Sequence, residues 1–284
     1  MRYLSLPKDE KNNTFVAQDV FDICVTMVKN PALRAQLEAI STDIKKAAIC
    51  YDTDAAAKTL YLTPLTAKIR KVNGDELVKV YTLRMVPKKA KGRQIYDRIL
   101  SAPVNGRCPF CGIGTVNTLD HFLPKTHFPV FSVTPNNLVP ACTWCQGEKM
   151  EYFATTAGGQ LLHPYFDNFD QDIWLAADVV KGSPAAFRYH VSPPAHWAVN
   201  DKARVAAHLK ELNLGLLFSS NAGSRLAEIR GRLVKLHNLG KMNAVRSHLE
   251  EELASMEEEC KNSWVAAMYR AAVASNWFCD GGFS

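Results

Sequence analysis

Hydrophobic residues recur at helical spacing in the first part of the chain. The stripe follows Asn30 and Pro31, a pair typical of a helix N-cap and of the first helical position. Its members lie three or four positions apart and are Leu33, Leu37, Ile40, Ile44, Ala48 and Tyr51. This spacing predicts a helical region whose stripe packs into a core. Farther on, Asn73-Gly74 lies among mixed apolar and polar residues and indicates a hairpin turn.

The last part of the chain has a second helical pattern. After Pro193-Pro194, helices are predicted at about 201–213, 220–238, 241–260 and 263–276. Gly240 is the expected stop between the second and third of them. Before the prolines, the segment AFRYHVS alternates apolar and polar positions, which predicts a strand.

The middle of the chain has a different pattern. GIGTVNTLDHF predicts a turn and a strand that ends at Asp120-His121, and FPVFSVT predicts a second strand. A short helix is expected around Cys145 and Lys149. The predicted fold class is therefore α+β and predominantly helical. Its expected segments are a helical region at 1–100, a central ββα unit at 101–170 and a mostly helical region at 171–284.

Composition supports an ordinary globular protein. Of the 284 residues, 47% are hydrophobic and 22% are charged. No apolar run reaches the roughly 18 residues needed to cross a bilayer, and the first residues lack the pattern of a signal peptide. We therefore expect a cytoplasmic protein without a membrane partner.

The net charge of +6 permits binding to a polyanion but does not require it. Its distribution is more informative, because eleven Lys or Arg residues and only three acids lie between Leu60 and Cys108. The candidate nucleic-acid contacts in and after this stretch are Lys88, Lys89, Lys91, Arg93, Lys125 and Lys149. The alternative for each of them is a solvated lysine or arginine on the surface.

Four of the eight cysteines form two Cys-x-x-Cys pairs, Cys108 with Cys111 and Cys142 with Cys145. Two such pairs can converge on one tetrahedral ion, because zinc needs four ligands near about 2.3 Å. In a reducing compartment this spacing favours structural zinc over disulfides. Such a site leaves no open coordination position, so any chemistry must come from residues between the pairs.

The stretch from Cys108 to Lys149 resembles the HNH endonucleases of the ββα-metal fold, in the branch framed by a four-cysteine zinc site. The resemblance rests on CPFC, LDHFLPK, NNLVPACTWC and QGEK, in that order. The flanking segments GRQIYD and LHPYFDNF also resemble HNH proteins of bacterial phage-defence operons, including those paired with an ATPase.

The resemblance implies a role for each matching position. His121 matches the general base, and Asp120 matches a ligand of the catalytic divalent cation, Mg²⁺ or another ion. Asn137 matches the residue that ties the loop and orients the histidine. Gln146 occupies the position of the second metal ligand, where the family usually has Asn or His. The chemistry is consistent, since imidazole is a base near neutral pH and a cation offsets charge at the phosphate.

Gln146 departs from the family pattern, because its longer side chain shifts the amide oxygen. His163 and Asp167 are the alternative ligands, and a hydrogen-bonded structural histidine is the alternative for His163. Lys125 or Lys149 can also stabilise charge at the phosphate.

The resulting hypothesis is a metal-dependent endonuclease that cuts DNA, acts in phage defence and docks an ATPase or other regulator. Its alternatives are a non-catalytic zinc-ribbon scaffold and a nuclease that cuts RNA.

Overall fold

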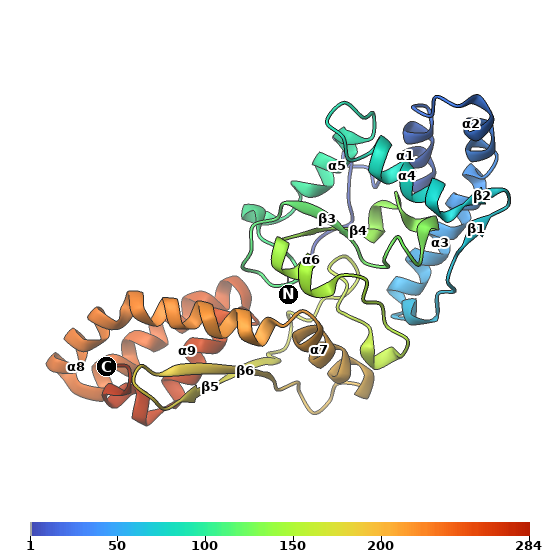
Figure 1. Ribbon diagram of the computed structural model, residues 1–284. Helices are drawn as coiled ribbons and strands as arrows, with labels where there is room; N and C mark the ends of the chain where they lie inside the picture. Colours follow the sequence, from blue (N-terminus) through green and yellow to red (C-terminus); the bar gives the residue numbers. More distant parts are fainter. Residues whose placement is uncertain (1) are drawn as a thin grey trace. The chain divides into compact units, whose positions relative to one another are not determined.

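The computed structural model describes residues 2–284, which form two compact units, Arg2–Asp167 and Asn168–Ser284 (Figure 1). The class is α+β with predominant helix, as predicted. The segments expected at 1–100 and 101–170 lie almost entirely in the first unit. Among residues 2–284, no helix is both long and apolar enough to span a bilayer.

The first unit combines six α-helices with two small antiparallel sheets. The helices are α1 (Ala17–Val25), α2 (Pro31–Glu38), α3 (Ser41–Ala56), α4 (Gly74–Arg84), α5 (Arg93–Leu100) and α6 (Thr143–Lys149). The strands are β1 (Lys68–Ile69), β2 (Val72–Asn73), β3 (Thr118–His121) and β4 (Leu138–Ala141). Short 3₁₀ turns are η1 (Leu60–Leu62), η2 (Val104–Gly106), η3 (Pro129–Phe131), η4 (Pro135–Asn137) and η5 (Ala157–Gly159).

The N-terminal hydrophobic stripe forms the expected helices. The Asn30 side chain accepts a hydrogen bond from the Leu33 amide at 3.0 Å, and Pro31 starts α2, so the predicted N-cap is confirmed. The stripe is divided between α2 and α3. Leu37 and Ile44, one on each helix, are both 1% exposed, so a short break lets the two helices bury one stripe.

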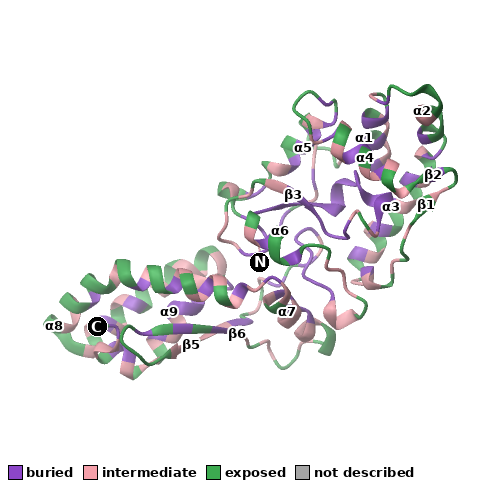
Figure 2. Ribbon diagram, viewed as in Figure 1, coloured by how far each residue is buried: buried purple, intermediate pink, exposed green. Residues whose placement is uncertain are grey.

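The central unit is built on the pairing of β3 with β4. The strands are antiparallel, with Asp120 opposite Val139 and His121 opposite Leu138. Figure 2 shows most of β3 as buried, since only Thr118 is half-buried, and every residue of β4 is buried. Helix α5 packs on both strands, and α6 follows β4 directly. The order strand, strand, helix is therefore present.

Two sequence predictions about strands are wrong. The second strand is β4, whereas the predicted strand FPVFSVT contains the 3₁₀ turn η3. Pro129 begins that turn and has no amide hydrogen, but β4 also contains a proline, Pro140 opposite Leu119, so the proline alone does not explain which segment pairs. Asn73-Gly74 is not the hairpin turn either, because β1 pairs with β2 across Arg70 and Lys71. Gly74 instead begins α4.

The second unit contains a strand hairpin and three α-helices. Its elements are β5 (Leu175–Val180), β6 (Ala186–Val191), α7 (Val199–Glu211), α8 (Leu214–Cys260), α9 (Trp264–Ala274) and the π-helical turn η6 (Phe278–Gly282). The strand predicted at AFRYHVS is confirmed as β6, which pairs with β5 in antiparallel fashion. Helix α8 packs against α9 and β6.

Helix α8 is interrupted at Gly240 and Lys241, where the backbone is not helical. This break confirms the predicted stop at Gly240. Arg225 and Glu252 form an ion pair at 3.6 Å across the break, so the two arms of α8 lie side by side. We call this pair of arms the α8 hairpin. Leu233 and Val245, one on each arm, are both 0% exposed.

The break places strain on Lys241, which has φ 56° and ψ −149°. This conformation is unfavourable for a residue with a Cβ atom and is natural for glycine. Lys241→Gly is therefore expected to raise the free energy of unfolding by about 1 kcal/mol, measured by urea denaturation. Lys241→Ala keeps the Cβ and removes the same charge, and should give no such gain. A loss of stability in the glycine variant would contradict this account.

Candidate functional site

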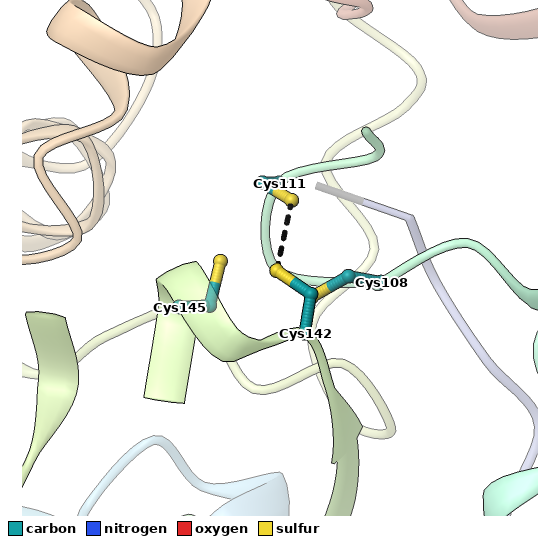
Figure 3. A group of neighbouring side chains, drawn as sticks. All are labelled: Cys108, Cys111, Cys142 and Cys145. Carbon is teal, nitrogen blue, oxygen red and sulfur yellow. Dashed lines mark hydrogen bonds between the residues drawn. The ribbon is translucent and has the colours of Figure 1, made fainter. Parts of the chain in front are cut away.

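The four paired cysteines meet in one buried cluster (Figure 3). Their sulfur atoms all lie within 4.8 Å of one another, and the Cys111 and Cys142 sulfur atoms are 3.8 Å apart. Sulfur ligands at about 2.3 Å from a tetrahedral zinc ion are separated by about 3.8 Å. The cluster therefore fits a zinc ion, and among residues 2–284 it is the one group of three or more His, Cys, Asp or Glu side chains at ligand spacing.

Each Cys-x-x-Cys segment forms a tight turn that we call a knuckle. In the first knuckle, Cys108 to Cys111, backbone amide groups donate hydrogen bonds that hold the turn and the Cys111 sulfur. Gly112 has φ +73°, which lets its amide donate to the Cys108 carbonyl at 2.7 Å. The Cys111 sulfur accepts amide hydrogens from Ile113 and Gly114, each at 3.4 Å. Amide donors of this kind favour a thiolate over a thiol.

Gly114 also allows the two knuckles to approach each other. A Cβ atom at Gly114 would lie 2.5 Å from the Cys142 sulfur, a distance that no side chain tolerates. The second knuckle begins with Cys142 at the end of β4 and places Cys145 in α6. Hydrogen bonding with the Cys108 thiol lowers the pKa of both Cys142 and Cys111. The pairing β3–β4–α6 is thus fixed at the end where the knuckles join.

Asp120 and His121 lie at the end of β3, where both side chains are buried. The Asp120 carboxylate is 7% exposed and its Oδ2 atom lies 3.0 Å from the Lys149 ammonium nitrogen. This contact is an ion pair without a well-aligned hydrogen bond, since Oδ2 has no hydrogen-bond donor. Burial raises the pKa of Asp120, and the charge of Lys149 acts in the opposite direction.

The imidazole of His121 is held in one orientation. Its Nε2 atom lies 2.9 Å from the carbonyl oxygen of Ser132, and its ring stands edge-on to Tyr81 with centroids 4.5 Å apart. A carbonyl accepts only, so Nε2 carries the hydrogen and Nδ1 of the neutral ring is free to accept a proton. Burial lowers the pKa of His121 to about 3, so the ring is neutral at pH 7.

Asn137 ties together the loop between β3 and β4. Its side-chain oxygen accepts from the Leu123 amide at 2.8 Å, and its nitrogen donates to the carbonyls of Leu123 at 3.1 Å and Phe131 at 3.3 Å. The residue is fully buried. These contacts join Asn137 to the backbone at Leu123 and Phe131, and the loop-tying role that the resemblance implies stays a prediction.

Gln146, the predicted second metal ligand, is exposed on α6. Lys149 of the same helix is 1% exposed and reaches Asp120. The ammonium group also donates to the His121 carbonyl at 2.7 Å. The sequence did not indicate this internal role for Lys149. The catalytic cation and its ligands Asp120, Gln146 and His163 stay predictions.

His163 is a buried histidine with both ring nitrogens in use. Nε2 lies 2.9 Å from the Tyr51 hydroxyl, and Nδ1 accepts from the Tyr165 amide at 3.2 Å. Asp167 accepts from the backbone amide of His163 at 2.7 Å. These contacts favour the structural alternative for His163.

The candidate nucleic-acid residues differ in exposure. Lys88, Lys89 and Lys91 are exposed between α4 and α5. Arg93 is partly exposed, pairs with Asp97 at 2.8 Å and lies over the Tyr96 ring. Lys125 lies 5.9 Å from the centroid of the Tyr81 ring that faces His121, and it also lines an open groove with Val78 of α4. The Lys149 side chain is buried and cannot reach a phosphate from solvent, whereas the other candidates are exposed or partly exposed.

The described geometry defines a protein with a ββα unit framed by a buried four-cysteine cluster that fits a metal ion. No family model matches the sequence, and no solved structure matches it. A relative does match: protein ea31 of Escherichia phage lambda is 34% identical over 238 residues, which cover 79% of this chain and 80% of that protein. The chain therefore belongs to the protein ea31 family.

The four-cysteine cluster predicts a zinc requirement for folding. Purified protein should contain one zinc ion per chain by elemental analysis, and Cys142→Ser should lose most of it and unfold at a lower temperature. Cys50 is an exposed cysteine outside the cluster, so Cys50→Ser is the matched control and should keep the zinc. Full zinc content in Cys142→Ser would contradict the assignment.

Proposed function

We propose that the protein is an endonuclease of the HNH type that hydrolyses phosphodiester bonds in DNA, with His121 as the general base. The observation that carries this proposal is the fixed, neutral imidazole of His121 beside Asp120 and the zinc-type cluster. Ser132 holds the proton on Nε2, which leaves Nδ1 as the acceptor. Asn137 supports that geometry by holding the loop that carries Ser132.

In the proposed reaction, a water oxygen attacks phosphorus while Nδ1 of His121 takes the water proton. The bond from phosphorus to the leaving oxygen breaks, and solvent protonates that oxygen. Lys125 and His121 both lie against the Tyr81 ring, so the positive charge of Lys125 lies near the imidazole. Because the described side chains do not assemble a ligand set for a divalent cation, no step is assigned to such an ion.

The exposed basic residues of the α4–α5 connection are proposed to contact DNA phosphates. Lys88, Lys89 and Lys91 carry charge without specifying base sequence. RNA remains the alternative substrate, since the same chemistry hydrolyses both backbones. Action in phage defence and an ATPase partner also remain proposals that follow from the resemblance.

A second candidate function is a zinc-ribbon scaffold without catalysis. The observation that favours it is the exposed Gln146 together with the buried pairing of Asp120 and Lys149. In that case, the ββα unit would serve only to bind a nucleic acid or a protein.

Nicking of supercoiled plasmid DNA separates the two candidates. His121→Ala should lower the rate by at least about 100-fold and leave the zinc content unchanged. His127→Ala, in the same loop and partly exposed, is the matched control and should cleave like the wild type. The assay is run with Mg²⁺, with Mn²⁺ and without added metal, and a labelled RNA is tested in parallel. Equal rates for both variants would refute the role of His121.

A further inference from the structure

Lys149 is a buried ammonium group at the centre of the candidate site. Its side chain is 1% exposed, and the nitrogen lies 3.0 Å from Asp120 Oδ2 and 2.7 Å from the His121 carbonyl oxygen. An ammonium group is costly to bury unless nearby oxygens replace its water. Asp120 and His121 supply those oxygens, so the charge of Lys149 is directed at the carboxylate rather than at solvent.

This ammonium group stands next to the oxygen to which a divalent cation would bind. A hard cation sits about 2.0–2.6 Å from a carboxylate oxygen. A cation on Asp120 Oδ2 would thus lie within roughly 6 Å of the Lys149 nitrogen, and the two positive charges would repel each other in a poorly hydrated site. Oδ2 is nevertheless buried without a hydrogen-bond donor, so it keeps a free lone pair.

We propose that Lys149 is the internal counter-ion of Asp120 and that its charge suppresses divalent-cation binding at this carboxylate. It is a positioning residue, because it acts through Asp120 and through the end of β3. The inference rests on the site described above but not on its hydrolytic activity. Removing the charge of Lys149 should turn Asp120 into a better divalent-cation ligand.

The test is Mn²⁺ binding to the full zinc-loaded chain, with free Mn²⁺ measured by electron paramagnetic resonance. Lys149→Met should bind Mn²⁺ at least 10-fold more tightly than the wild type, and adding Asp120→Asn should abolish that gain. Lys125→Met removes one charge from a partly exposed lysine and is the matched control, with a smaller change expected. Equal Mn²⁺ affinity for the wild type and Lys149→Met would overturn the proposal.

A wild-type comparison covers the case in which Lys149→Met does not fold. Asp120→Asn alone should leave the Mn²⁺ affinity of the otherwise wild-type chain unchanged, because Lys149 already keeps the ion away from Asp120. A loss of affinity in Asp120→Asn would show that the wild-type carboxylate binds the cation despite Lys149 and would refute the inference. Neither result depends on nuclease activity, so failure of the proposed function is detected separately.

A different observation concerns the distribution of charge along the α8 hairpin. Residues 229–249 contain five Lys or Arg and two His residues but no acid, whereas residues 250–259 contain six Glu. Arg225 pairs with Glu228 and Glu252, and Arg270 pairs with Glu257. Beyond Glu228 the helix therefore has no acidic residue until Glu250.

Four exposed cations lie in this basic stretch without an ion pair among residues 2–284. They are Arg230, Arg232, Lys235 and Lys241, and we call them the hairpin tip. The fifth, Arg246, is used internally, because it donates to Val273 and Asn276. Gly231 lies between two of the tip cations, and a Cβ there would meet nothing, so a ligand can approach the helix closely.

We infer that the hairpin tip binds the phosphate backbone of a nucleic acid. Unpaired exposed cations within one stretch of the α8 hairpin favour a partner with regularly spaced negative charges. A membrane-surface helix would instead present a broad apolar face, whereas the large exposed apolar residues near the tip are Val234 and Leu239. The inference deepens the proposed function, since it assigns nucleic-acid binding to the second unit.

Fluorescence anisotropy with a labelled 30-base-pair DNA tests this surface in a His121→Ala background, which prevents cleavage. Replacing the four tip cations by Gln should weaken binding at least 10-fold and lower the salt-dependence slope by about 3 to 4. The matched control replaces the exposed Lys45, Lys46, Lys68 and Lys71 by Gln, with the same change in net charge.

The control variant should bind within twofold of the parent. An equal loss in both variants would mean that only net charge matters, and an unchanged tip variant would remove the tip from the interface. Vesicles of phosphatidylcholine and phosphatidylserine are tested beside the DNA. Loss of vesicle binding with retained DNA binding in the tip variant would overturn the inference in favour of a lipid surface. Binding is measured without turnover, so a failed nicking assay does not affect the result.

Discussion

The convergence of four cysteine sulfur atoms is the constraint on which the central unit depends. It joins Cys111 to Cys142, 31 positions apart, and so fixes the start of β3 relative to the junction of β4 and α6. Two four-residue strands and a seven-residue helix bury too little surface to be stable alone. A metal ion held by the four cysteines would supply that stability, while α5 packs on both strands. Asp120 and His121 gain their fixed positions from this frame.

The other end of β3 lies away from the cysteine cluster and is held by buried hydrogen bonds. Lys149 bonds the end of β3 to α6, Ser132 orients His121, and Asn137 holds the loop that carries Ser132. Each of these groups is buried and each has a hydrogen-bond partner, so their directions are set. The candidate chemistry therefore depends on backbone carbonyls as much as on side chains. Membership of the protein ea31 family leaves that chemistry open, which is why the site geometry carries the proposal.

The second unit has a simpler physical basis. The two arms of α8 bury apolar residues between them, α9 and the β5–β6 hairpin, and ion pairs form where acids and bases meet at the base of the hairpin. Residues 229–249, on both sides of the break at Gly240, contain no acid. The exposed positive charges there repel one another only weakly, because solvent and salt screen them. The separation of basic from acidic residues along α8 can be read from the sequence, but the exposure of the basic side chains is decided by the fold.

Local signals in the sequence determined much of this protein. Asn30 and Pro31 set the start of α2, Gly240 marked the break in α8, and the Cys-x-x-Cys pairs indicated the metal cluster, because each of these effects acts within a few residues. Only the tertiary structure decided which segment pairs with β3, since a four-residue strand carries too little pattern to distinguish β4 from the stretch at Pro129. It also left Gln146 exposed and buried Lys149 against Asp120, although both lie on α6. Contacts between segments far apart in the sequence decide which of two nearby residues is buried and which segment pairs with β3. The spacing of apolar residues along the chain does not contain these contacts.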